Sequence, residues 1–284
     1  MAIDQNVFYT GTDTNNGLPF PQGMTGTARD AHFYIGRLGG ELQANLAAWD
    51  VKAAKSATKS FAYWDLAGTP DKASATNWGD NQALAFLAAY HRYRPATLGT
   101  TLFFDVEPGN GGWTPGHALI NQAVLAGALA VIAKSGYTPG IYCSRATWIA
   151  FFGAHFVPTT PFVLWLAGTY CPKTAQEAMT GWRTLSRLGG QAPSIWQYSV
   201  SGGGCPTSPM QDWNVTPYGG WQEGRWTPIP ATAQPTSPTA AESTSPTVAE
   251  VQAMVHRDLL AAQQALNTAL TALDAIQTAL QTLG

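Results

Sequence analysis

The chain has 284 residues, of which 45% are hydrophobic and 11% charged, and its formal net charge is −2. This length and apolar content allow a substantial core, whereas the balanced charge gives no long-range field to attract nucleic acid. No run approaches the length of a membrane span, and the N-terminus lacks the basic and apolar regions of a signal peptide.

Short apolar runs rich in aromatic and β-branched residues recur along the first two-thirds of the chain and predict eight strands. In chain order these are VFYTGTD (7–13), HFYIGRL (32–38), SFAYWDL (60–66), TLFFDVE (101–107), GIYCS (140–144), FVLWLAG (162–168), SIWQYS (194–199) and MQDWNV (210–215).

Ala/Leu-rich stretches between the strands predict helices, at 42–57, 79–94, 115–135, 145–152 and 174–188, while 14–31 has an irregular pattern. Strands that are apolar along most of their length and alternate with helices favour a (β/α)₈ TIM-like barrel over an open sheet. We therefore expect an α/β fold of this class, followed by a flexible linker and a C-terminal coiled-coil helix.

The boundaries of these parts follow from composition. Every Trp, Tyr and Phe lies at or before Trp226, so we assign the barrel to 1–226. The segment 227–247 contains five prolines and reads as a semi-extended linker.

In 248–284 apolar residues recur in alternating steps of four and three, which is the seam of a coiled coil. We expect this helix to associate with copies of itself or with a partner helix, the alternative being that it folds back onto the barrel. The seam consists of Val255, Leu259, Ala262, Leu266, Ala269, Leu273, Ile276, Leu280 and Leu283.

The three cysteines show no CxxC spacing, and their odd number argues against a full disulfide framework. Cys143 is predicted to be a small core residue. Cys171 and Cys205 lie in Gly/Pro-rich loops, and the sequence leaves open whether a disulfide joins them. No phosphate loop, metal cluster or Ser/His nucleophile motif is recognisable, so the sequence implies no cofactor and no metal.

The run TLFFDVEPG carries the strongest chemical signal. Alternation places Asp105 and Glu107 on one face at the end of a strand, where catalytic groups of α/β barrels gather. Two neighbouring carboxyl groups raise the pKa of one of them, as a general acid for glycosidic cleavage requires. The alternative is a structural pair in which Asp105 meets a basic residue and Glu107 caps a loop.

Other strand ends contribute further polar groups. Asp13, Asp65 and Asp212 end or lie in three other strands, so acidic side chains from four strands converge on one mouth. Asp13 and Asp212 have turn formation as their alternative role. Arg37 is either a counter-ion of this cluster or a ligand of the substrate.

Several aromatic residues also fall late in strands, where they can stack on sugar rings or be buried in the wall. With the polar residues near them they form the expected substrate-binding set, which comprises Arg37, Trp64, Asp65, Tyr142, Trp165, Trp196, Gln197, Tyr198 and Asn214.

The order FFDVEPG, GYTPGIYCS, VLWLAGTY and SIWQYS…QDWNV resembles that of the family-25 lysozymes, which are muramidases with an irregular α/β barrel. It is equally similar to a less characterised glycoside-hydrolase-like barrel family, through GTDT, YIGRLGG and WQY. The resemblance covers about 6–216 and implies Glu107 as general acid, Asp105 as its partner carboxylate, and Asp13 and Asp212 as the rest of the acidic cluster.

The resemblance has two departures, since the first strand reads GTDTNNG and the third reads FAYWDLAG where the lysozymes have a Tyr-His pair. We expect a glycoside hydrolase that cleaves β-1,4 bonds of peptidoglycan, or else a non-catalytic barrel that binds wall glycan on a helical stalk. The partner is then peptidoglycan or a related glycan. We expect synthesis in the cytoplasm and release by lysis, or incorporation into a virion or injection particle.

Overall fold

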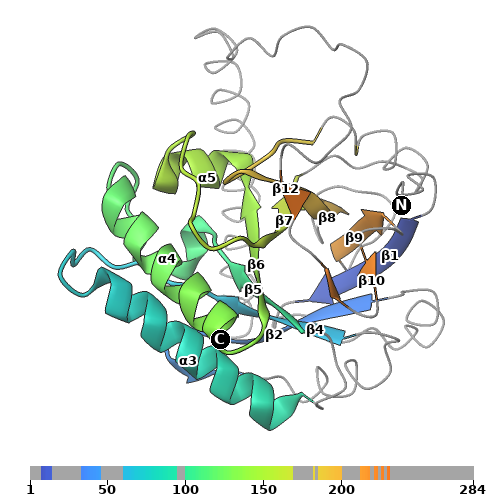
Figure 1. Cartoon of the computed structure of the whole chain (residues 1–284), viewed down its shortest axis with the longest axis horizontal. Helices are drawn as coiled ribbons and strands as arrows, with labels where there is room; N and C mark the ends of the chain where they lie inside the picture. Colours follow the sequence, from blue (N-terminus) through green and yellow to red (C-terminus); the bar gives the residue numbers. More distant parts are fainter. Residues whose placement is uncertain are drawn as a thin grey trace, which may run out of the picture. The chain divides into compact units, whose positions relative to one another are not determined.

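A computed structural model describes residues 8–14, 33–45, 60–94, 100–168, 182, 185–199, 212–217, 221–222, 225–226 and 229–230. These residues form a mixed α/β fold in which one curled sheet carries helices on its outer side (Figure 1). The predicted linker and C-terminal helix lie outside the described residues, apart from 229–230. So do Cys171 and Cys205, and the connection 14–31 beyond its first residue.

Ten strands belong to the curled sheet, and all eight predicted strands are among them. They are β1 (Phe8–Thr14), β2 (Phe33–Gly40), β3 (Gln43–Ala44), β4 (Ser60–Asp65), β5 (Thr101–Asp105), β6 (Thr138–Ser144), β7 (Val163–Ala167), β8 (Gln191–Ser199), β9 (Asp212–Pro217) and β12 (Ile229–Pro230). A separate ribbon pairs β10 (Trp221–Gln222) with β11 (Arg225–Trp226).

The strand order is β1-β9-β8-β7-β6-β5-β4-β2-β3, and β1 also pairs with β2, so the ladder of hydrogen bonds returns to its first strand. From β1 through β2, β4, β5, β6 and β7 to β8 the neighbours are parallel. The carboxyl ends of these strands therefore meet at one rim, which is where ligands bind in parallel α/β folds.

The fold departs from eight repeated βα units at the last strand. β9 runs antiparallel to both β8 and β1. The segment 200–211 that joins β8 to β9 has a Gly/Pro-rich sequence that does not favour the helix by which parallel strands are usually connected. Because β9 is reversed, its first residue rather than its last lies at the rim.

Three helices are described on the outer side of the sheet: α3 (Ala75–Tyr93), α4 (Ala118–Lys134) and α5 (Arg145–Phe152). They agree with the predictions at 79–94, 115–135 and 145–152. The prediction of a helix from 42 is wrong at its start, because 43–44 form β3 instead. Most of the predicted helix 174–188 lies outside the described residues, and Leu185–Arg187 in it are not helical.

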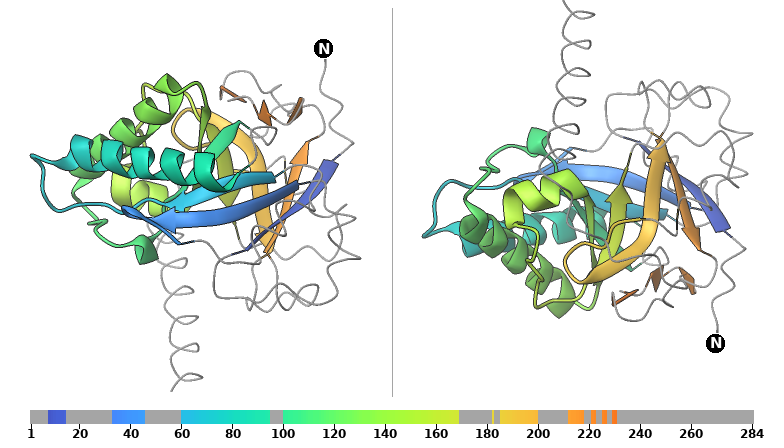
Figure 2. Two further views of the ribbon diagram at one scale, coloured as in Figure 1. Left: turned by 90° about the horizontal axis from the view of Figure 1, so that it is seen from below. Right: turned by 90° about the horizontal axis from the view of Figure 1, so that it is seen from above.

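Side chains divide between two cores according to strand alternation. Figure 2 shows α3, α4 and α5 on the outer side of the sheet. Outward-facing residues such as Phe104 pack in one core with residues of these helices. Inward-facing residues such as Phe103 and Trp165 fill the interior of the curled sheet. Cys143 is buried in the outer core and not in a disulfide, as predicted. Among the described helices, none is both long and apolar enough to cross a bilayer.

The contact between α3 and α4 generates a stability prediction. A Cβ atom at Gly79 of α3 would lie 2.0 Å from the backbone oxygen of Val124 in α4. Gly to Ala in a helix normally stabilises by about 1 kcal/mol, but here a backbone must move, and overpacking costs about 1–3 kcal/mol. We expect Gly79→Ala to lower the free energy of unfolding in urea.

Gly109 provides the matched control, since a Cβ atom there meets nothing within 4 Å. We expect Gly109→Ala to leave the unfolding free energy within about 0.5 kcal/mol of the parent, as surface substitutions do. Equal effects of the two substitutions would contradict the close approach of the helices.

Candidate active site

The rim formed by the carboxyl ends of the parallel strands carries four of the predicted polar residues. Asp13 lies near the end of β1, Arg37 in β2, Asp65 at the end of β4 and Asp105 at the end of β5. Asp65 and Asp105 are direct neighbours in the parallel ladder. The predicted convergence of acidic strand ends is therefore confirmed for these three carboxylates.

Asp13 is held by a network of uncharged donors inside the sheet. Gln197 Nε2 donates to both of its carboxylate oxygens, at 3.3 and 3.1 Å, and Asn214 Nδ2 donates to Oδ2 at 2.6 Å. Trp165 Nε1 in turn donates to Asn214 Oδ1 at 2.7 Å, and the Tyr142 hydroxyl donates to Gln197 Oε1 at 2.6 Å. Asp13 therefore does not use its carboxylate to form a turn but accepts hydrogen bonds from Gln197 and Asn214 inside the sheet.

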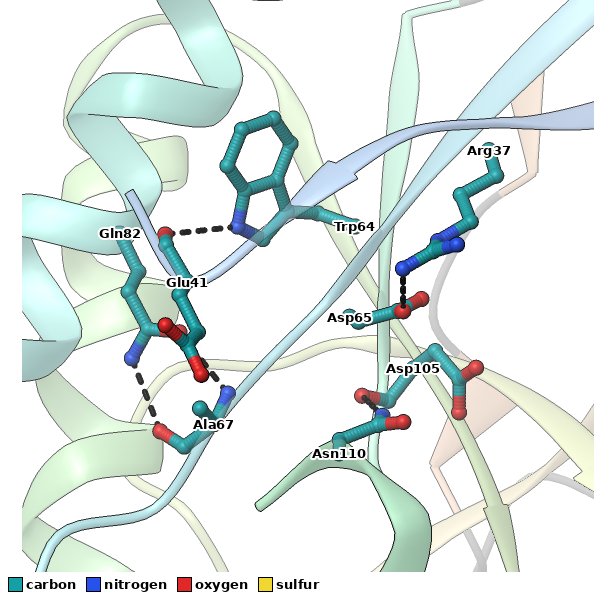
Figure 3. Close-up of polar contacts among 8 residues, drawn as sticks. All are labelled: Arg37, Glu41, Trp64, Asp65, Ala67, Gln82, Asp105 and Asn110. Carbon is teal, nitrogen blue, oxygen red and sulfur yellow. Dashed lines mark hydrogen bonds and ion pairs between the residues drawn. The ribbon is translucent and has the colours of Figure 1, made fainter. Parts of the chain in front are cut away.

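Arg37 and Asp65 form an ion pair at the rim, which Figure 3 shows beside Asp105. This confirms the counter-ion role of Arg37. Burial raises the pKa of Asp65, while the charge of Arg37 and its hydrogen bond lower it. One of the three rim carboxylates thus has a cation beside it.

Asp105 is in a different position, because its buried Oδ1 has no hydrogen-bond partner. Burial raises its pKa well above that of an ordinary aspartic acid, and the negative charges of Glu107, Asp65 and Asp13 raise it further, against a lowering hydrogen bond from Asn110. Asp105 therefore keeps a proton to a higher pH than an exposed carboxyl group does.

Glu107 lies just beyond β5, in extended backbone before the short 3₁₀ helix η1 (Pro108–Asn110). The predicted strand to 107 is thus two residues too long. Glu107 nevertheless lies close enough to Asp105 for its negative charge to raise the pKa of Asp105. The two half-buried carboxyl groups form the pair that the sequence predicts.

The predicted aromatic contacts are corrected by the structure. Trp64 is fully buried, its ring stacks on Phe86 of α3 at 5.5 Å, and its Nε1 donates to the Glu41 backbone oxygen (Figure 3). Asp65 faces the rim, so strand alternation turns Trp64 toward the helices. The prediction that Trp64 binds substrate is wrong.

Trp165 and Trp196 are each only 2% exposed, so they too belong to the wall and not to an open stacking surface. Tyr142 is likewise buried, and with Gln197 and Asn214 it supports Asp13 from below the rim. The backbone of Asp212 pairs with Asp13 at the start of β9. The side chains of Asp212 and Tyr198 lie outside the described part of the chain.

Three residues near the rim were missed by the sequence interpretation. Tyr63 is buried two positions before Asp65, and its pKa is raised by burial and by Asp105, Asp13 and Asp65. Asn110 Nδ2 donates to the Asp105 backbone oxygen at 2.7 Å. Glu41 lies at the turn between β2 and β3. Alternation from Asp65 signals Tyr63, whereas nothing in the local sequence signals the other two.

A cleft of about 310 Å³ opens at the part of the rim that carries Asp65. Its lining includes Arg37 and Asp65 from the sheet, Glu41 and Gln43 from the β2–β3 turn, and Asn110 from η1. Within the described part of the chain, no group of three or more His, Cys, Asp or Glu side chains is arranged to hold a metal ion. The chemistry available at this rim is that of carboxyl groups, one of which binds a proton unusually tightly.

The fold that surrounds this rim is that of the lysozymes of glycoside hydrolase family 25. No protein-family model matches the sequence, and no curated protein matches it. Similarity is found among solved structures, at identities so low that they demonstrate the fold alone.

A family GH25 lysozyme from Aspergillus fumigatus is 17% identical with a TM-score of 0.54, over 74% of this chain and 94% of that one. A family 25 glycosyl hydrolase from Bacillus anthracis is 16% identical with a TM-score of 0.51, over 77% and 92%. The spore cortex lytic enzyme SleM of Clostridium perfringens is 17% identical with a TM-score of 0.52, over 74% and 67%.

The raised pKa of Asp105 predicts how stability depends on pH. Since the folded protein binds the proton more tightly than the unfolded chain, stability falls as pH rises from the ordinary Asp range through the raised value. We expect Asp105→Asn to raise the unfolding free energy at neutral pH by on the order of 1 kcal/mol or more. In denaturant titrations this gain should shrink as the pH is lowered.

Asp71 serves as the control of opposite sign. It is exposed, and its pKa is lowered by the Ser74 side chain and the Ala73 amide, which donates to Asp71 Oδ1 at 2.9 Å. We expect Asp71→Asn to lose stability at neutral pH rather than gain it. A gain for Asp71→Asn equal to that for Asp105→Asn would show that general charge repulsion, and not the site, is responsible.

Proposed function

We propose that this protein is a peptidoglycan glycan-strand hydrolase that cleaves β-1,4 glycosidic bonds as a muramidase does. The observation that carries the proposal is the pairing of Asp105, with its raised pKa and unpartnered Oδ1, with Glu107 at the carboxyl rim. Cleavage of a glycosidic bond needs one carboxyl group to donate a proton to the leaving oxygen and a second group to assist the substrate at the anomeric carbon.

Glu107 is the proposed general acid, and Asp105, which keeps its proton to a higher pH than an ordinary aspartic acid, is the proposed partner that hydrogen-bonds the acetamido group of the substrate. The acid gives its proton to the glycosidic oxygen as the bond from that oxygen to the anomeric carbon breaks. Water then adds its hydroxyl to that carbon, and its proton restores the acid. Asp13, held by its hydrogen bonds from Gln197 and Asn214, is a further acid of the proposed site, and Asp212, which pairs with Asp13 in the ladder, is proposed as the fourth.

The first test is release of reducing ends from purified peptidoglycan by the full chain. We expect Glu107→Gln and Asp105→Asn each to lower the rate by about 10²–10⁴-fold, the range for loss of an acid or base. Asp71→Asn, which removes an exposed carboxylate outside the rim, should keep the parent rate. Thermal melting of each variant separates loss of activity from loss of folding.

A glycan with a phenolate-type leaving group distinguishes the two roles, because such a group departs without a proton. We expect it to restore the rate of Glu107→Gln and not that of Asp105→Asn. Restoration of Asp105→Asn instead would exchange the two assignments. A parent protein that sediments with peptidoglycan but releases no reducing ends would be a glycan-binding barrel and no hydrolase.

The domain plan is part of the same proposal. We propose an eight-stranded barrel of the TIM type over 1–226, to which β12 (Ile229–Pro230) adds at β8, and which the rest of the linker up to 247 joins to a coiled-coil helix at 248–284. A helix that assembles several copies suits a wall enzyme released by lysis or built into a virion or injection particle. The heptad seam in the sequence supports this part.

Self-association through the seam is tested in the full chain by sedimentation. We expect Leu266→Asp with Leu273→Asp to convert the assembly to monomer, because a charge in a coiled-coil seam loses its burial. Gln264→Asp with Thr271→Asp, on the opposite side of the heptad, should leave the assembly intact. A parent chain that is already monomeric would leave a partner helix or the barrel as the occupant of the seam.

A further inference from the structure

Asn110 of η1 is hydrogen-bonded to both members of the carboxyl pair. Its side-chain Nδ2 donates to the backbone oxygen of Asp105 at 2.7 Å (Figure 3), and its backbone N–H donates to the backbone oxygen of Glu107 at 3.1 Å. The Asp105 oxygen also accepts from the Leu66 N–H at 2.9 Å, so both of its lone pairs are used. The end of β5 is therefore held by the chain after β4 and by η1 together.

The chain that follows η1 is fastened to the segment after β4. Gly68 N–H donates to the Gly111 oxygen at 2.9 Å, and Trp113 Nε1 donates to the Leu66 oxygen at 2.7 Å. The Trp113 ring is buried and stacks on Phe151 of α5 at a centroid distance of 5.6 Å. The loop that carries η1 is thus anchored by contacts in which the two carboxyl groups take no part.

The charges around Asp105 explain why a neutral donor suits this place. Burial and its acidic neighbours raise the pKa of Asp105, whereas the hydrogen bond from Asn110 lowers it. An amide opposes the shift without bringing a cation that would hold Asp105 ionised. Within the described part of the chain, the titratable groups that interact with Asp105 are Asp13 of β1, Tyr63 and Asp65 of β4, Glu107 and Cys143 of β6, and Arg37 of β2 pairs with Asp65.

From these contacts we infer that Asn110 is a positioning residue of the proposed active site, which holds Asp105 and Glu107 in a fixed relation to each other. The inference rests on the proposed function, in which these two carboxyl groups have different tasks. A misplacement of about 1 Å can cost about 10²-fold in rate. A residue bonded to both carboxyl-bearing residues therefore controls the rate by acting through them.

Two substitutions separate the hydrogen bond from the filling of space. Asn110→Ala removes the side-chain donor, and Asn110→Asp keeps the shape but brings a negative charge to the end of β5. We expect the pKa of Asp105 to rise in both variants, and further in Asn110→Asp, because a lowering bond is lost and a negative charge is added. Carbon-13 NMR titration of the aspartate carboxyl groups in the full chain measures this, with the Asp105 signal assigned by its absence in Asp105→Asn.

Asn121 of α4 provides the matched control. Its Nδ2 donates to the backbone oxygens of Thr114 and Phe151 at 3.0 and 2.9 Å, which is the same kind of bond outside the carboxyl pair. We expect Asn121→Ala to lower the melting temperature and to leave the titration of Asp105 and kcat as in the parent. Asn81→Ala, which removes an exposed amide of α3, should change none of the three.

Hydrolysis of peptidoglycan supplies the second measurement. We expect Asn110→Ala to lower kcat about tenfold to 10²-fold while KM stays within about threefold of the parent. A raised KM with an unchanged kcat would make Asn110 a substrate contact of the cleft and would overturn the inference. An Asp105 titration that neither Asn110 variant moves would overturn it as well.

The titration keeps the two proposals apart because it needs no hydrolysis. A shifted Asp105 titration in the Asn110 variants of a parent that releases no reducing ends refutes the hydrolase and keeps Asn110 as the residue that positions the pair. Hydrolysis that proceeds at the parent kcat in both Asn110 variants refutes the positioning role alone.

Discussion

Asp13 is a charged group buried to 5% exposure, and the arrangement of the rim depends on the hydrogen bonds that make this burial tolerable. Its donors come from β8 and β9, and their own partners come from β6 and β7. Strands distant in sequence are thus tied to β1 through one carboxylate. Substituting any donor leaves a buried polar group unpaired, which costs about 1–3 kcal/mol, so this network orients the strands whose ends carry the site.

The rim carboxylates divide by the partners that each one has. Asp13 accepts hydrogen bonds from amides, and Asp65 has the guanidinium of Arg37. The remaining strand-end carboxyl, Asp105, has a buried oxygen without a partner and meets the charges of its neighbours. Burial raises the pKa of both Asp65 and Asp105, but only Asp65 has a cation beside it that opposes the shift. A perturbed pKa of this kind is typical of a site that handles protons.

Strand periodicity made most of the fold predictable. Alternation in TLFFDVE puts Phe103 and Phe104 on opposite faces of the strand, and each of the two cores contains one of them. The same rule should have turned Trp64 away from the rim, because its neighbour Asp65 faces it. The reversed direction of β9 is consistent with a Gly/Pro-rich connection that does not favour a crossover helix, which is a property of the loop and not of the strand.

The features that sequence did not predict arise from contacts between segments. Nothing in RLGGELQAN signals that a two-residue turn replaces the start of a helix, because the turn is held by Trp64 and Asp65 of the next strand. Asn110 similarly gains its role only where η1 returns to the end of β5. Local pattern therefore locates the acids, while tertiary contacts build the cleft around them.

The β2–β3 turn brings residues to the cleft that a regular βα unit would not place there. In a regular βα unit a helix would follow β2 and would cover the outside of the sheet without reaching the rim. Here the chain turns back after Gly40 and holds Glu41 and Gln43 over the pair formed by Arg37 and Asp65. Asp105 ends β5 and Glu107 follows it, so this strand supplies the carboxyl pair. The turn after β2 is a separate element and supplies Glu41 and Gln43 to the cleft lining.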